Sequence, residues 1–142
     1  MDLGLDGRRA LVLGSSSGLG RAVAATLLAE GAKVAVVSRD RDRSAAAADE
    51  LGADAALVVD LVVPGAGDAV VADAVEALGG LDIVVVNTGG GTPGPILATG
   101  GHDDAAYHSM LRPVLEVSRA AAPHVTAGGA GRIEIVVRQL TG

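Results

Sequence analysis

Short apolar runs alternate with segments of helical spacing along the whole chain. The apolar runs are rich in Val, Leu and Ala, which is typical of strands buried on both faces of a parallel sheet. In the segments between them, apolar residues recur every three to four positions and glycine often follows, which predicts helices with glycine ends. The predicted strands cover residues 8–14, 33–38, 54–61, 81–87 and 131–137, and the predicted helices cover residues 18–30, 41–52, 67–80 and 103–126.

This alternation predicts an α/β fold. Strand–helix–strand units with short links make right-handed crossovers, so the strands are expected to form one parallel sheet. No repeat or linker divides the sequence, and residues 1–142 are predicted to be a single domain. Pro113 falls inside the last predicted helix. A proline there removes a backbone hydrogen bond and costs ~3 kcal/mol or more unless the helix kinks at this position.

Composition and charge argue against nucleic-acid binding, metal binding and membrane insertion. The net charge is -6 and the arginines are dispersed, so the basic stripe of a nucleic-acid-binding protein is missing. The absence of Cys excludes disulfides and thiolate metal sites. No metal is predicted, because His102, His108 and His124 do not share a helix face. No run approaches the ~20 apolar residues of a membrane helix, so a cytoplasmic location is expected.

The stretch "GSSSGLG" (14–20) joins the first predicted strand to the first predicted helix. Gly14 permits a tight turn, Gly18 permits close backbone approach to a pyrophosphate, and Gly20 lets the helix pack against the strand. The free amides and the positive helix end would receive phosphates, and Ser15, Ser16 and Ser17 add hydroxyl donors. A plain tight turn is the alternative in a chain with 21 glycines, but the strand–helix context favours a dinucleotide site.

The Gly-x3-Gly-x-Gly spacing, together with "VVSR", "VVDL" and "LDIVVVNTGG", resembles the short-chain dehydrogenase/reductase family. The "NTGG…PGP" run looks most like bacterial 3-oxoacyl reductase-like members. The resemblance implies a Rossmann-like, doubly wound parallel sheet of about five strands in the order 3-2-1-4-5, with helices on both faces. It covers the first half to two thirds of a usual member, so the sheet would be truncated after strand five. The implied function is an NADP(H)-binding oxidoreductase of carbonyl or hydroxyl substrates.

The resemblance also assigns cofactor contacts. Ser38 and Arg39 stand where NAD-preferring members carry an acid, and a guanidinium there would bind a 2′-phosphate, so NADP is favoured over NAD. A helix cap or a solvated surface residue is the alternative for Arg39. Asp60 would accept a hydrogen bond from the adenine amino group beside Leu61, although a solvated strand-end acid is nearly as good an interpretation. The predicted cofactor-binding residues are Gly14, Ser16, Ser17, Gly18, Leu19, Gly20, Ser38, Arg39, Asp60, Leu61, Asn87, Thr88 and Gly89.

The catalytic pattern of the family is not matched. Met110 stands where the family has the Asn of its catalytic tetrad, and "RQLTG" follows the fifth predicted strand, where the family needs a Ser and then a Tyr-x-x-x-Lys. In the family, Tyr protonates the carbonyl, Lys lowers the pKa of that Tyr, and Ser orients the substrate. Tyr107 has no Lys four residues on and is predicted to be a packing residue. We therefore predict no catalytic residues in this chain and no activity on its own.

Three functions remain open at this point. The chain is an NADP-dependent oxidoreductase of which these residues are a fragment or a frameshifted product, a non-catalytic nucleotide-binding module or partner subunit, or a structural domain that binds nothing. A fifth strand at the sheet edge and a helix with an uncovered face predict a homo-oligomer, or association with a chain that supplies the missing half. Neither nucleic acid nor membrane is an expected partner.

Overall fold

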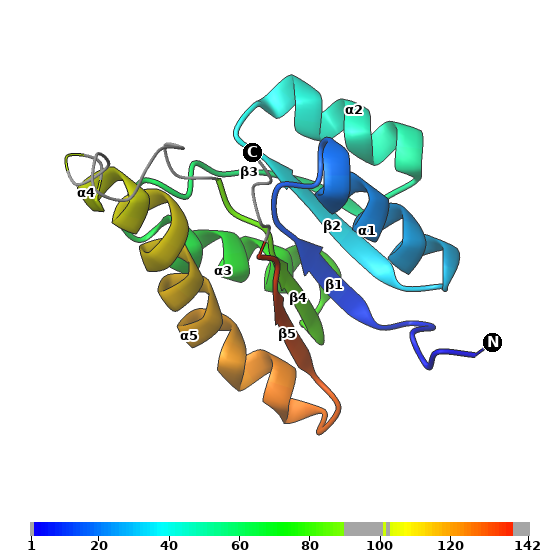
Figure 1. Ribbon diagram of the computed structural model, residues 1–142. Coiled ribbons are helices and arrows are strands. Elements are labelled where there is room, and N and C mark those ends of the chain that lie inside the picture. Colours follow the sequence, from blue (N-terminus) through cyan, green and yellow to red (C-terminus); the bar gives the residue numbers. More distant parts are fainter. Residues whose placement is uncertain (1, 90–100, 102, 138–142) are drawn as a thin grey trace.

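All five strands are parallel and lie in the order β3-β2-β1-β4-β5 (Figure 1). The computed structural model describes residues 2–89, 101 and 103–137. The strands are β1 (Arg9–Val12), β2 (Lys33–Ser38), β3 (Ala55–Val58), β4 (Ile83–Val86) and β5 (Arg132–Ile135). The helices are α1 (Gly18–Ala29), α2 (Arg41–Leu51), α3 (Ala66–Leu78), α4 (Asp103–Ala106) and α5 (Arg112–Ala127), with a π-helical turn η3 (Tyr107–Leu111) between the last two. The predicted Rossmann-like architecture and strand order are confirmed.

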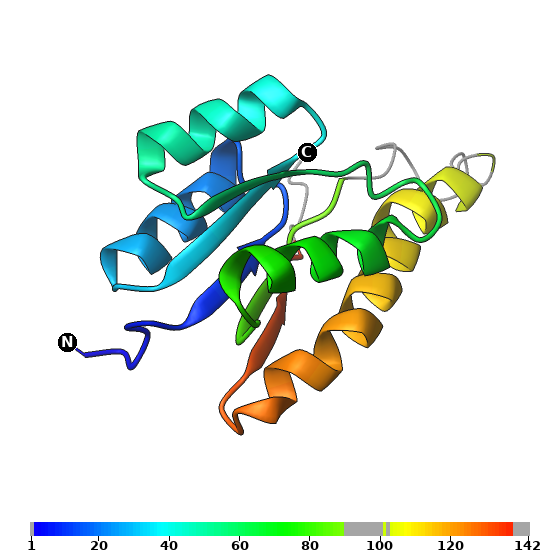
Figure 2. The same cartoon turned by 180° about the vertical axis from the view of Figure 1, so that it is seen from behind.

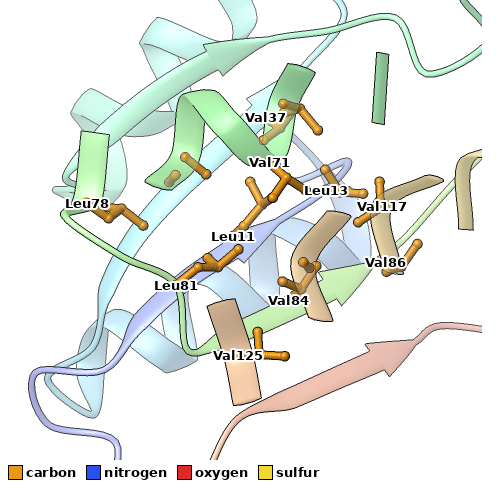
Figure 3. Close-up of a cluster of buried hydrophobic side chains, with 14 residues drawn as sticks. Leu11, Leu13, Val37, Val71, Leu78, Leu81, Val84, Val86, Val117 and Val125 are labelled. Carbon is orange, nitrogen blue, oxygen red and sulfur yellow. The ribbon is translucent and has the colours of Figure 1, made fainter. Parts of the chain in front are cut away.

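Helices cover both faces of the sheet, with α1 and α2 on one side and α3 and α5 on the other (Figures 1 and 2). This arrangement explains why β4 reads as an unbroken apolar run, since every residue of the strand is buried. On the α3 and α5 side, leucines and valines from the sheet and both helices interdigitate (Figure 3). The opposite face packs against the smaller residues of α1, including Ala24. Small side chains let this helix lie close to the sheet.

The segment predicted as one helix over residues 103–126 is helical throughout, but it is not regular. It forms α4, the wider turn η3 and then α5. Pro113 is buried at the beginning of α5, directly after η3, where the N–H of Arg112 donates to the carbonyl of Tyr107 five residues back. A proline has no N–H to continue a regular helical pattern, and a wider turn is a common way to accommodate it. The irregularity lies before the proline, in η3.

Tyr107 is not the packing residue predicted for it. Its side chain is 43% exposed, and its ring lies edge-on to that of His108 with 5.2 Å between the centroids. The helix buries Val117, Ala121 and Val125 instead. Helical spacing therefore predicted the buried face of α5 correctly. It did not predict that Tyr107, in the turn η3 before this helix, is exposed.

A partly buried ion pair joins the beginnings of β1 and β4. Asp82 is 8% exposed, and its Oδ2 accepts hydrogen bonds from the backbone N–H of Arg9 at 3.0 Å and from Nε of the same residue at 2.9 Å. Its Oδ1 accepts a third bond from Arg9 Nη2 at 3.1 Å. The hydrogen bonds from Arg9 hold the pKa of Asp82 below its ordinary value.

Replacing Asp82 with alanine is expected to lower the free energy of unfolding by about 2 kcal/mol, because Arg9 and its backbone amide lose their acceptor. A carboxyl whose pKa is depressed by folding stabilises the fold above its unfolded pKa of about 3.9, and that contribution disappears as the pH falls through the folded pKa. Urea unfolding at neutral pH and below pH ~4 measures both effects. The exposed Asp73→Ala is the matched control. Equal losses in the two variants at neutral pH would contradict this account.

Candidate functional site

A cleft of about 870 Å³ opens at the carboxyl ends of four neighbouring strands, from β3 across to β4. In an open α/β sheet this is the edge at which ligands bind, and the volume lies within the range of small-molecule sites, about 300–1,000 Å³. The lining residues are Gly14, Ser16 and Ser17 after β1, Ser38, Arg39, Asp40 and Arg43 after β2, Val59, Asp60, Leu61 and Val62 after β3, Asn87, Thr88 and Gly89 after β4, and Ser109 from η3. The cleft is thus mostly made of strand-to-helix turns.

The turn between β1 and α1 fits tightly against the end of β4. Gly14 has a φ of +60°, and a Cβ at this position would lie 2.9 Å from the backbone oxygen of Asn87. A Cβ on Gly20 would collide with the carbonyl oxygen of Gly14. The side-chain amide of Asn87 donates a hydrogen bond to that same carbonyl over 3.4 Å. These contacts fix the turn before α1 at the edge of the cleft, and side chains at Gly14 or Gly20 would displace it.

The three serines of this turn have different roles. Ser15 is fully buried, where its hydroxyl donates to the carbonyl of Val12 at 2.7 Å and accepts from the amide of Val37 at 2.8 Å. The prediction that Ser15 offers a hydroxyl to a ligand is therefore wrong, since this side chain ties β1 to β2. Ser16 and Ser17 line the cleft as predicted, and the hydroxyl of Ser17 caps no amide of α1 among the described residues.

The turn after β2 brings two arginines to the cleft. The carboxylate of Asp40 accepts from the amide of Arg43 at 3.0 Å and caps α2, so Arg39 is not the helix cap that was its alternative. Ser38 orders the turn by accepting from the amide of Asp40 at 3.1 Å. Arg39 and Arg43 both line the cleft, and neither belongs to an ion pair formed by the described residues. This end of the cleft therefore offers two guanidinium groups to an anion.

Sequence reasoning missed Arg43. The signal was present, because Arg43 belongs to the first turn of the predicted helix that begins two residues after Arg39. Val59 and Val62 were also missed. They are apolar residues beyond the end of β3, and only the path of the chain after that strand brings them to the cleft.

The turns after β3 and β4 complete the cleft. Asp60 is exposed there and accepts a hydrogen bond from the amide of Val62 at 3.1 Å, while Leu61 is half-buried and packs against the core. Asn87, Thr88 and Gly89 line the cleft where the sequence placed them. The predicted residues that do not line it are Gly18, Leu19 and Gly20.

The structure describes only part of the segments in which the family has its catalytic residues. Met110 is 45% exposed, and its neighbour Ser109 is the η3 residue that lines the cleft. The segment "RQLTG" (138–142), the loop 90–100 and His102 lie outside the described residues.

Within the described part, His, Asp and Glu side chains form no group of three that could hold a metal ion. No helix in that part of the chain is long and apolar enough to cross a membrane.

A family profile and individual relatives agree on the family that this sequence resembles. A family profile described as "short chain dehydrogenase" matches residues 8–139. The chain is 35% identical to L-xylulose reductase of Mus musculus over 130 residues, which are 91% of this chain and 52% of that protein. It is 33% identical to sorbitol dehydrogenase of Cereibacter sphaeroides over 129 residues, which are 89% of this chain and 50% of that protein. The chain thus spans about half the length of the curated relatives it matches.

Solved structures share the fold and differ in the dinucleotide they hold. A short chain dehydrogenase from Burkholderia cenocepacia in complex with NADP matches with a TM-score of 0.81 and 37% identity, over 92% of this chain and 55% of that one. L-Sorbose reductase from Gluconobacter frateurii, with NADPH and L-sorbose, matches with a TM-score of 0.85 and 33% identity, over 95% and 54%. A 7α-hydroxysteroid dehydrogenase with NADH matches with a TM-score of 0.84 and 30% identity, over 93% and 53%.

Proposed function

This chain belongs to the short-chain dehydrogenase family, and we propose that it binds NADP(H) in the cleft at the carboxyl ends of β1 to β4. The observation that carries the proposal is the presence of two arginines, Arg39 and Arg43, at the end of the cleft beside Ser38, where neither forms an ion pair with another described residue. Guanidinium groups favour a phosphate over a ribose hydroxyl. Relatives of similar likeness hold NADP, NADPH or NADH, so the preference is argued from these residues.

The remaining residues fit the other parts of a dinucleotide. The amides at the beginning of α1, with the hydroxyls of Ser16 and Ser17, would bind the pyrophosphate. Asp60 would accept a hydrogen bond from the adenine amino group, with Leu61 beside the ring. Asn87, Thr88 and Gly89 would border the nicotinamide half. Gly14 and Gly20 support this arrangement, because larger side chains at these positions would displace the turn.

We further propose that the 142-residue chain on its own binds the dinucleotide without transferring a hydride. NADPH supplies a hydride when bound, but reduction of a carbonyl also needs a proton donor, which in the family is a Tyr with a Lys four residues later. The sequence has one Tyr, Tyr107, and one Lys, Lys33, so that pair does not occur. Oxidoreductase activity on a carbonyl or hydroxyl substrate would then need groups that these 142 residues lack, and we propose that the chain self-associates or pairs with a partner that supplies them.

Binding is tested by titrating the protein with NADPH and following the fluorescence of the reduced nicotinamide. We expect a saturable change at one site per chain. A linear response up to millimolar NADPH would contradict the proposed function and favour a structural domain that binds no nucleotide.

Hydride transfer is tested separately, by following NADPH absorbance with a panel of ketones, aldehydes and sugars. We expect no oxidation above the protein-free rate, because general-acid catalysis typically contributes ~10²–10⁴-fold and its residues are missing. Saturable turnover by the purified chain would contradict this prediction, while leaving the binding proposal intact.

A further inference from the structure

The loop that joins β3 to α3 forms one wall of the cleft with residues 59–62. It leaves the sheet after Val59, whose amide still donates to the carbonyl of Ser38 in β2 at 3.0 Å. Among the described residues, all the hydrogen bonds that tie residues 60–67 to a different element go to α5. The position of this wall therefore depends on a helix that lies much further along the chain.

Glu116 of α5 caps the beginning of α3. The N-cap residue of α3 is Gly65, which has no side chain that could cap the helix. Glu116 supplies the acceptors, since its Oε1 accepts from the amide of Gly65 at 3.1 Å and its Oε2 from that of Gly67 at 3.2 Å. A carboxylate is favoured here, because the first amides of a helix lack partners and carry a partial positive charge. The helices lie close together at this point, and a Cβ on Gly67 would be 2.6 Å from that of Glu116.

Arg112, one helical turn before Glu116, holds the same loop closer to the cleft. Its Nη2 donates to the carbonyl of Val62, which is the last residue of the loop that lines the cleft. Its Nε lies 3.7 Å from Oε1 of Glu116, and the two side chains are only 18% and 15% exposed. Figure 2 shows the loop between β3 and α3 running toward the beginning of α5. The Arg112–Glu116 pair thus binds backbone groups on both sides of the turn that enters α3.

We propose that Arg112 and Glu116 are positioning residues for the dinucleotide, which hold the cleft-lining loop in place without lining the cleft themselves. Only Asp60 and Leu61, the residues proposed to contact adenine, lie between the bond to β2 and the bond to Arg112. A loop fixed at both ends is ordered before the ligand arrives, so binding does not have to order it. This inference rests on the proposed function, because it assigns a role in binding the same dinucleotide.

Replacing Glu116 with alanine is expected to loosen the loop in the free protein and to weaken NADPH binding as a result. Hydrogen exchange of the Gly65 and Gly67 amides, followed by NMR without nucleotide, should become about tenfold faster or more, because both amides lose their acceptor. The NADPH dissociation constant, measured by fluorescence titration, should rise about tenfold. Arg112→Ala should raise the same dissociation constant, because the carbonyl of Val62 loses its donor.

Two controls and a double-variant cycle separate positioning from a general loss of stability. Glu76→Ala and Arg119→Ala remove the same charges from exposed positions of α3 and α5, and should change the dissociation constant by less than about twofold. In the Asp60→Ala background, Glu116→Ala should weaken NADPH by no more than about a further twofold, because the loop contact through which it acts is already lost. A merely structural role would give the full tenfold effect in both backgrounds.

Faster exchange at Gly65 and Gly67 with an unchanged NADPH dissociation constant would overturn the positioning role, and so would full additivity with Asp60→Ala. If circular dichroism shows that Glu116→Ala is unfolded, Glu116→Gln replaces it: this variant keeps one acceptor oxygen and should weaken NADPH about threefold, whereas wild-type affinity would overturn the role. A wild-type chain that binds no NADPH would refute the proposed function and the positioning role with it. Wild-type binding that the variants leave unchanged would refute the positioning role alone.

Discussion

Replacing Arg39 with aspartate is expected to reverse the dinucleotide preference from NADPH to NADH. The wild-type guanidinium is exposed, lines the cleft and belongs to no ion pair of the described residues, so it is free to make charge-assisted bonds to a 2′-phosphate. An aspartate would repel that phosphate and accept hydrogen bonds from the ribose hydroxyls of NADH. The ratio of the two dissociation constants should change roughly a hundredfold. Fluorescence titration with both dinucleotides measures it.

Two further variants show whether this effect is local. Arg41→Asp makes the same change in net charge one residue beyond Asp40, but Arg41 does not line the cleft. It should leave the ratio of dissociation constants nearly unchanged. Arg43→Ala should weaken NADPH about tenfold and NADH little, as expected for a second guanidinium on the phosphate. Equal effects of Arg39→Asp and Arg41→Asp would mean that Arg39 acts only through net charge.

Replacing Gly20 with alanine is expected to damage both the fold and the cleft. The added Cβ would collide with the carbonyl oxygen of Gly14 and lie 3.0 Å from the side-chain nitrogen of Asn87. A backbone carbonyl cannot move aside as a long side chain can, so α1 must shift away from β1 and β4. We expect a loss of about 3 kcal/mol in the free energy of unfolding and NADPH binding weakened tenfold or more. Urea unfolding and the NADPH titration measure the two effects.

Two control variants, Gly18→Ala and Ala22→Ser, show whether the stability loss of Gly20→Ala comes from the collision with Gly14. Gly18 has a φ of +59° but open space around its Cβ position, so its substitution should cost about 1 kcal/mol through backbone strain. Ala22 is exposed on the same helix, and its substitution should change stability by at most about 0.5 kcal/mol. If Gly20→Ala is as mild as Ala22→Ser, the close fit of α1 against the sheet is not what shapes the cleft.

Much of the fold could be predicted because the central strands β1, β2 and β4 are buried on both faces and therefore read as continuous apolar runs. The bounds predicted for β2, residues 33–38, agree with the structure. The strand predicted over 54–61 is shorter, Ala55–Val58, because the chain turns away after the paired residues and forms the cleft with Val59, Asp60 and Leu61. The position of the cleft followed from the same topology, since parallel strands end at one edge.

What the sequence could not show depends on which way a side chain turns. Three successive serines follow Gly14, and nothing in their order reveals that Ser15 turns inward to join β1 and β2. Likewise, the periodicity before Pro113 is compatible with a regular helix, yet the chain adopts a wider turn there and leaves Tyr107 exposed. In both places the outcome is decided by tertiary contacts, which a local pattern does not contain.

The central claim is that this cleft binds NADP(H) and selects it through its 2′-phosphate. Isothermal titration calorimetry of the wild-type chain with NADP⁺ and with NAD⁺, under identical salt, tests it most directly. We expect one NADP⁺ per chain, bound about tenfold or more tightly than NAD⁺, because the two dinucleotides differ only in the group that Arg39 and Arg43 would contact. Equal affinities, a preference for NAD⁺, or no heat with either dinucleotide would contradict the account.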